Sequence, residues 1–221
     1  MDFPADSARP WLESLPWAIA PEAWRGPLRA QAERLGARFA ERGLSASIVF
    51  EPAWVRGYAE AVARETGGKA WSPLSYAVSP CAALVLHNGA RVHATIGARL
   101  MWIEGALGVA MRRWPEAPNV GPDLAADIVD RHVVWLGALW RDPVLQGQGL
   151  GQALTEAMAI DALCRWRFSH LVGVRRDRGL LALEMAPFRR LEAPLTTGDG
   201  GTYALVAAAR AQVRALFAVS A

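Results

Sequence analysis

Residues 139–151 read LWRDPVLQGQGLG, and the fold is inferred outward from this stretch. An apolar run precedes it and a helical pattern follows it, so its glycines stand at a turn from a strand into a helix. The first amides of a helix have no partner inside the helix, and the helix dipole adds partial positive charge there. Glycine removes the Cβ atoms that would hold a ligand away. The stretch therefore predicts a backbone cradle for an anion, best suited to a phosphate or pyrophosphate.

Two common phosphate-binding motifs do not match this cradle. A Walker A loop requires GxxxxGK[ST], and the one lysine of the chain, Lys69, lies far from the glycines. The dinucleotide fingerprint GxGxxG fails by one place, because Gly147, Gly149 and Gly151 are spaced GxGxG. The segment instead resembles motif A of the GNAT superfamily of N-acetyltransferases, which has Gln or Arg, two residues, Gly, one residue, then Gly or Ala. Here it reads Gln146-Gly147-Gln148-Gly149-Leu150-Gly151.

The rest of the chain has the pattern of a mixed α/β protein. Apolar residues at three- and four-residue steps predict a helix over 21–43, and Asn88-Gly89 is typical of the turn of a hairpin within 81–105. Residues 1–20 are expected to be irregular, and 105–131 to form one or two helices. The other predicted elements are strands at 46–52, 132–140, 168–174 and 202–207, and helices at 54–68, 149–166, 207–219 and from 179 to a break at Pro187. We expect one compact domain, in which an N-terminal helical extension, 1–44, packs on a GNAT-like core, 45–221.

The resemblance implies a central, twisted, mixed sheet with helices on both faces. Strands 132–140 and 168–174 would be parallel but splayed apart, and the pantetheine arm of acetyl-CoA would lie in the resulting V-shaped cleft. The arm would pair like an extra strand with the first of these strands, and amides of the glycine loop would hold the pyrophosphate. The implied binding residues are Leu139, Trp140, Arg141, Gln146, Gly147, Gln148, Gly149, Leu150 and Gly151.

The resemblance also implies a reaction, the acetyl-CoA-dependent N-acetylation of a primary amine on a small molecule or a protein. The amine would attack the thioester directly, with neither a covalent enzyme intermediate nor a metal. Because the amine must lose a proton, Glu104 at a strand end and His132 at the start of the motif strand are candidate bases. A solvated strand end for Glu104 and a surface or capping role for His132 remain open.

One departure from the family keeps other functions open. Many members place an Asn and then a Tyr in the helix after the fifth strand, whereas residues 175–192 contain neither, and Tyr203 is too late to match. A non-catalytic or regulatory acyl-CoA-binding module is therefore an alternative to the enzyme. A third hypothesis is an interaction domain whose tryptophan-rich surfaces bind protein and no nucleotide.

Composition restricts the remaining function classes. Apolar residues make up 52% of the chain and charged residues 20%, which favours a folded core over disorder. The net charge of +3 gives no footprint for nucleic acid, and no apolar run is long enough for a membrane span. Cys81 and Cys164 lie in neither CxxC nor CxxH spacing, so a disulfide framework or zinc site is not expected. With an N-terminus unlike a signal peptide, the expected compartment is the cytoplasm. A homodimer is left open.

Overall fold

The computed structural model describes residues 4–65, 80–89, 91–112, 125–145, 147–176, 188–191, 195–196 and 202–218. Gln146 of the predicted glycine loop lies outside these residues, as does the predicted helix that begins at 179.

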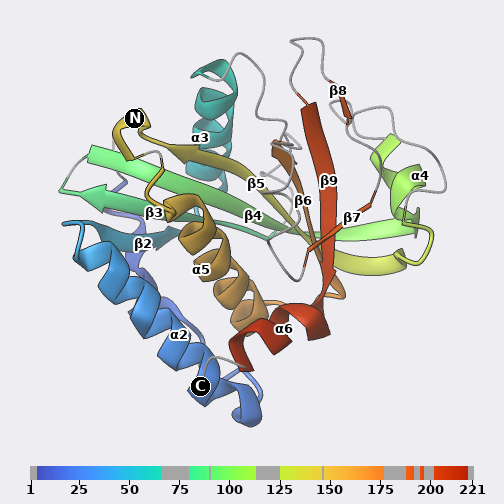
Figure 1. Ribbon diagram of the computed structural model, residues 1–221, viewed down its shortest axis with the longest axis horizontal. Helices are drawn as coiled ribbons and strands as arrows, with labels where there is room; N and C mark the ends of the chain where they lie inside the picture. The colour runs from blue at the N-terminus through green and yellow to red at the C-terminus, as the bar shows by residue number, and fades with distance from the viewer. Residues whose placement is uncertain are drawn as a thin grey trace.

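A mixed sheet runs through the molecule, as Figure 1 shows. Its described strands follow the order β1-β2-β3-β4-β5-β6-β9-β7, with β8 paired to β9. Neighbouring strands are antiparallel except β5 and β6, which are parallel. The predicted mixed α/β sheet is therefore confirmed. The strands are β1 (Ala8–Pro10), β2 (Ser45–Val49), β3 (Cys81–Asn88), β4 (Arg91–Ala106), β5 (Val129–Arg141), β6 (His170–Arg176), β7 (Arg189–Arg190), β8 (Leu195–Thr196) and β9 (Thr202–Ala209).

The predicted hairpin is formed by β3 and β4, with two corrections. Asn88 pairs with Arg91, so the two connecting residues begin at Gly89, whose φ is +54°, rather than at Asn88. β4 also continues to Ala106, so Glu104 lies within the strand rather than after it. In the segment 105–131, only α4 (Leu107–Arg112) is helical among the described residues. The segment's last residues, from Val129 on, belong to β5.

In Figure 1, one face of the sheet is covered by α2 (Glu22–Ala40), α5 (Leu150–Arg165) and α6 (Arg210–Ala218). The apolar stripe predicted for the first helix is buried, and it shares one core with α5 and with every second residue of the central strands. Residues of this core include Leu28, Ala32, Leu35 and Phe39 of α2, Leu154 and Met158 of α5, and Ile48, Leu84, Ala98 and Val134 of the sheet.

The N-terminal segment belongs to the same core. The sequence predicts irregular structure over residues 1–20, and for 8–14 this prediction is wrong. β1 pairs with β2, and the short helix α1 (Trp11–Ser14) buries Trp11 completely. At the start of α2, the guanidinium groups of Arg210 and Arg214 lie over the Trp24 ring, 5.3 and 4.9 Å from its centroid. The segment before residue 45 is thus fastened to both the sheet and α6.

The opposite face of the sheet carries α3 (Pro52–Glu65) and α4. Val55, Tyr58 and Val62 of α3 pack on Ala83 and Val85 of β3. The apolar side chains of α4 join a separate cluster with the odd-numbered residues at the start of β5, Val133 and Trp135. No helix in the part of the chain that the structure describes is long and apolar enough to cross a bilayer.

Candidate functional site

β5 and β6 run side by side over only a short stretch. Their parallel register extends from Val133 opposite His170 to Leu136 opposite Gly173. Among the described strands, β5 then continues beside β4 alone and β6 beside β9 alone. The predicted splay of two parallel strands is confirmed, and the strands part at their carboxyl ends.

Gly173 permits the closest approach of the two strands before they part. A Cβ atom at this position would lie 3.0 Å from the carbonyl oxygen of Leu136. That oxygen belongs to the backbone, so it has little freedom to move aside. The absence of a side chain at Gly173 therefore helps to fix the point from which the strands diverge.

β5 carries one extra residue just beyond that point. Gly137 stands opposite Gly97 of β4, whereas Trp140 stands opposite Thr95, so three steps along β5 match two along β4. A bulge of this kind leaves backbone groups out of the ladder. Leu139, inside the bulge, is 41% exposed.

The predicted binding edge for the pantetheine arm follows the bulge. Trp140 and Arg141 pair with β4 on one side, and residues 137–141 have no partner on the other side among the described strands. Trp140 packs its ring against the cluster beneath α3. This stretch therefore presents a strand edge to which an extended ligand could add.

The glycine loop connects this edge to α5. Gly147 and Gly149 have φ of +81° and +69°, a region that glycine enters without the steric cost of a Cβ atom. Gly149 is the N-cap residue of α5, and no side chain caps the helix there. The first turn of α5 also contains no acidic residue. The predicted turn from a strand through glycines into a helix is thus present, and no side-chain cap occupies the first N–H groups of α5, which the sequence assigns to an anion.

Asp142 anchors the turn between β5 and the loop. Its Oδ2 accepts a hydrogen bond from Arg91 at 2.7 Å, and its Oδ1 accepts one from the N–H of Val144 at 3.1 Å. The Val144 N–H and the Arg91 guanidinium lower the pKa of the Asp142 carboxyl, with burial acting in the opposite direction. His93 Nδ1 also lies 3.5 Å from Oδ2. Asp142 is therefore a structural turn residue, as its Arg-Asp-Pro context predicts.

The two candidate bases, His132 on β5 and Glu104 on the neighbouring β4, lie at the amino end of β5. His132 pairs with Trp102 across β4 and β5, and their rings meet edge to face with centroids 4.9 Å apart. Glu104 is exposed in the irregular stretch between Ile103 and Ala106. His132 is five residue steps along β5 from Gly137, about 17 Å at 3.3–3.4 Å per residue, and Glu104 lies further back, between the partners of Arg131 and Val129. The structure thus places both residues far from the glycine loop.

The pairing of β9 with β6 places Tyr203, which is distant in sequence, beside the end of β6. Tyr203 stands opposite Arg176, the last residue of β6. Distance along the sequence had set this residue aside. An antiparallel return strand is the feature that could have drawn attention to it.

Neither cysteine suits nucleophilic chemistry. Cys81 and Cys164 are both free and buried. Burial, with the neighbouring Asp161 carboxylate, raises the pKa of the Cys164 thiol to about 12. Cys164 is therefore a small buried residue that packs in the core. Among the described residues, no group of three or more His, Cys, Asp or Glu side chains could hold a metal ion.

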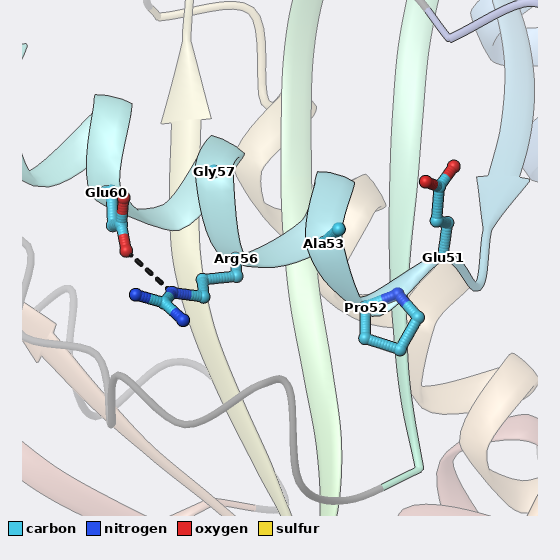
Figure 2. A pocket seen from close by; sticks show the side chains of 6 residues that line it. All are labelled: Glu51, Pro52, Ala53, Arg56, Gly57 and Glu60. Carbon is cyan, nitrogen blue, oxygen red and sulfur yellow. Dashed lines mark hydrogen bonds and ion pairs between the residues drawn. The ribbon is translucent and has the colours of Figure 1, made fainter.

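A surface hollow of about 590 Å³ lies along α3, and Figure 2 shows the side chains that line it. Its lining residues come from the start of the helix and its exposed side, and Arg56 and Glu60 pair across one turn at 2.8 Å. None of the predicted binding residues lines it. The lining residues are Glu51, Pro52, Ala53, Arg56, Gly57 and Glu60.

The likeness of this chain to known proteins lies in its fold. No family model and no curated protein matches the sequence. The chain is similar in structure to FeeM, an N-acyl amino acid synthase from uncultured soil microbes, with 16% identity, a TM-score of 0.53, and coverage of 78% of this chain and 93% of that one. It is also similar to an acyl-CoA N-acyltransferase from Pseudomonas aeruginosa (12% identity, TM-score 0.48, coverage 75% and 99%). A third similar structure is an aminoglycoside acetyltransferase in complex with coenzyme A (15% identity, TM-score 0.44, coverage 76% of this chain and 96% of that one).

Proposed function

We propose that this chain, which has the fold of the GNAT superfamily of N-acyltransferases, is an acyl-CoA-dependent N-acyltransferase. One observation carries the proposal. A bulged strand end leads through a left-handed glycine loop into an uncapped helix, beside the point where a parallel neighbour parts from that strand. An acyl-CoA requires both parts of this arrangement, because its arm is extended and its diphosphate is anionic.

The residues present suit the two parts of such a substrate. The edge at Leu139, Trp140 and Arg141 offers backbone groups to the amides of a pantetheine arm, as a sheet edge does to an added strand. The N–H groups of residues 147–151 suit the diphosphate, because they combine unsatisfied donors with the positive end of the α5 dipole. Gln146 completes the motif in the sequence and remains an expectation.

The proposed chemistry is direct transfer. The nitrogen of a neutral amine attacks the thioester carbonyl carbon, the C–S bond breaks, and the CoA thiolate leaves. The amine nitrogen gives up one proton to a base, and the thiolate accepts one from an acid or from water. Backbone donors near the parting of β5 and β6 would stabilise the oxyanion that forms between these two events.

Acetyl-CoA is the proposed donor, and a primary amine of a small molecule or a protein the acceptor. The likeness to an N-acyl amino acid synthase supports an acceptor of small size, the α-amine of an amino acid included. The glycine loop would contact the diphosphate and not the acyl group, so it does not select the acyl chain. Acyl-CoA donors with longer chains should therefore be tested beside acetyl-CoA.

Binding is the first test of this proposal. Ligand at 100 times its Kd stabilises a fold by about 2.7 kcal/mol, which raises the Tm of a chain of this size by roughly 5–10 °C. We expect acetyl-CoA to produce a shift of that size and AMP, which lacks the diphosphate and the arm, to produce none. A wild-type protein that does not shift at millimolar acetyl-CoA would refute the proposal.

Turnover is the second test, and it separates two candidate functions. Release of free CoA thiol on addition of amines, with the acylated product identified by mass, would establish a transferase. Tight binding without amine-dependent thiol release would instead establish the alternative, an acyl-CoA-binding or regulatory module. The absence of Asn and Tyr from residues 175–192 is the observation that favours this alternative.

A further inference from the structure

A helix of the N-terminal segment reaches the glycine loop. α2 and α5 lie side by side on the sheet in Figure 1, and Gln31 of α2 donates a hydrogen bond to Glu156 of α5 at 3.1 Å. Seven residues further along α2, Arg38 donates from Nη2 to the carbonyl oxygen of Gln148 at 3.4 Å. The two helices are therefore antiparallel, and Arg38 lies at the beginning of α5.

The contact between Arg38 and the loop is close. A Cβ atom at Gly149 would lie only 2.6 Å from Nη2 of Arg38. The guanidinium thus occupies the space that a side chain at the N-cap position would need. The positive φ requires a small residue at Gly149, whereas the end of the Arg38 side chain could move aside.

A second guanidinium, from a strand residue, packs against the same first turn of α5. Arg141, the last residue of β5, places Nη1 3.1 Å from the position of a Cβ atom at Gly151. It is half-buried. Its guanidinium forms no hydrogen bond or ion pair with any residue that the structure describes.

The charges around the loop are unbalanced. Within the described parts of the chain, neither Arg38 nor Arg141 pairs with a carboxylate. Asp142, the residue after Arg141, binds Arg91, and Glu156 of α5 binds Gln31 and Gln152. Two cations thus converge on the positive end of a helix dipole, an arrangement that an anion would stabilise.

We propose that Arg38 and Arg141 bind the diphosphate of the acyl-CoA from either side of the glycine loop. The identity of the ligand rests on the proposed function, whereas the anion site rests on the two guanidiniums. A guanidinium offers paired N–H donors that match phosphate oxygens, which an amide-only loop does not supply. The segment 1–44 is then part of the substrate site as well as of the core.

Arg34 provides a matched control for Arg38. It lies one turn earlier on α2, is exposed, and donates only to Gln31 of its own helix, at 2.9 and 2.7 Å. Arg34→Gln and Arg38→Gln remove the same charge from the same helix. Arg38→Lys keeps the charge and removes the paired donors, which separates general attraction from direct binding.

The experiment is calorimetric titration of the full-length protein with acetyl-CoA and, separately, with inorganic pyrophosphate. A lost hydrogen bond to a charged group weakens binding by about 10-fold or more. We expect that loss for Arg38→Gln with both probes, a smaller loss for Arg38→Lys, and a change within about twofold for Arg34→Gln. Unchanged Tm values of the free variants would show that each is folded.

The outcomes separate this inference from the proposed function. If wild type binds both probes and Arg38→Gln binds them as tightly as Arg34→Gln does, the inference is wrong and the proposed function stands. If wild type binds pyrophosphate through Arg38 but not acetyl-CoA, the anion site stands and the acyltransferase is wrong. If wild type binds neither probe, both are wrong.

Discussion

At its amino end, β5 is irregular, but its backbone finds partners within the chain. Gly105 and Asp130 both have positive φ, +72° and +47°, and the ladder shifts register between Ile103 and Ala106. The N–H of Gly105 donates to Asp130 Oδ1 at 2.7 Å. The N–H of Leu107, which opens α4, donates to the Ile128 carbonyl at 2.9 Å.

At its carboxyl end, β5 shows the same two irregularities with a different outcome. Gly147 and Gly149 have positive φ, and the ladder shifts register between Thr95 and Gly97. Here the following helix has no side-chain cap, and Arg141 is left without an ion pair in the described chain.

The comparison shows that bulges and left-handed residues do not by themselves mark a binding site. Both ends of one strand have them. What distinguishes the carboxyl end is that the uncapped start of α5 lies beside two guanidinium groups, of which Arg38 reaches only the Gln148 carbonyl oxygen and Arg141 has no acceptor among the described residues. A ligand is the partner that such groups would otherwise lack.

The largest expected effect comes from reversing the charge inside the cradle. Gly149→Asp forces a side chain into left-handed backbone, against Arg38, and puts a carboxylate where the diphosphate should lie. We expect acetyl-CoA affinity to fall by roughly 100-fold or more, since strain, a clash and like-charge repulsion act together. The measurement is the Tm shift at millimolar acetyl-CoA, with folding checked by circular dichroism.

Gly105→Asp at the amino end is the matched control for this variant. Its φ is equally left-handed, and a Cβ atom there would meet nothing within 4 Å. We expect a loss of stability of about 1 kcal/mol from backbone strain, with the ligand-induced shift retained. Equal shifts in the two aspartate variants would remove the distinction between the ends of β5.

The next largest effect concerns the point where β5 and β6 part. Gly173→Ala places a Cβ atom 3.0 Å from the backbone oxygen of Leu136, so the strands must separate. We expect a loss of about 1–3 kcal/mol in the free energy of unfolding, measured by urea titration. Gly57→Ala on α3 has open space around it and should stabilise the protein by up to about 1 kcal/mol. A neutral Gly173→Ala would mean that the parting point is not fixed by this contact.

Local signals in the sequence predicted the glycine loop correctly. Gly147 and Gly149 adopt the left-handed conformations that only glycine enters easily, so their spacing carried structural information by itself. The strand before them and the amphipathic helix after them were likewise readable from a few neighbours.

Contacts distant in sequence could not be predicted in this way. Arg38 lies 110 residues from Gln148, and only the packing of α2 on α5 brings them together. The position of Glu104 and His132 depended on strand direction and register, which alternating hydrophobicity does not give. The helices expected over 105–131 were partly wrong for the same reason, since long strand pairing with β4 extends β5 back to Val129.

A smaller effect is expected from the anchor of the loop. The Val144 N–H and Arg91 hold the pKa of Asp142 below its ordinary value of 3.8 in the folded chain. Its contribution to stability is therefore fully present well above pH 3.8 and is lost as the pH falls through the lower, folded-state pKa. We expect the Tm difference between wild type and Asp142→Asn at pH 5 to shrink as the pH falls below about 4. A difference that is as large at pH 2 as at pH 5 would contradict the role of the carboxylate.

The smallest effect is expected at the amino end of β5, for Glu104→Gln and His132→Gln. Both residues remain sequence predictions for the general base, and removing a true base lowers kcat by roughly 100-fold or more. His132 lies about 17 Å along β5 from the bulge and Glu104 lies further back on β4, so both are beyond the reach of a proton transfer to an amine held there. We therefore expect kcat/KM to change by less than about twofold, with an unaltered pH–rate profile. A 100-fold loss in either variant, with one limb of that profile removed and acetyl-CoA affinity retained, would establish that residue as the base. The acceptor would then be bound at the amino end of β5, and the assignment of the chemistry to the carboxyl end would be wrong.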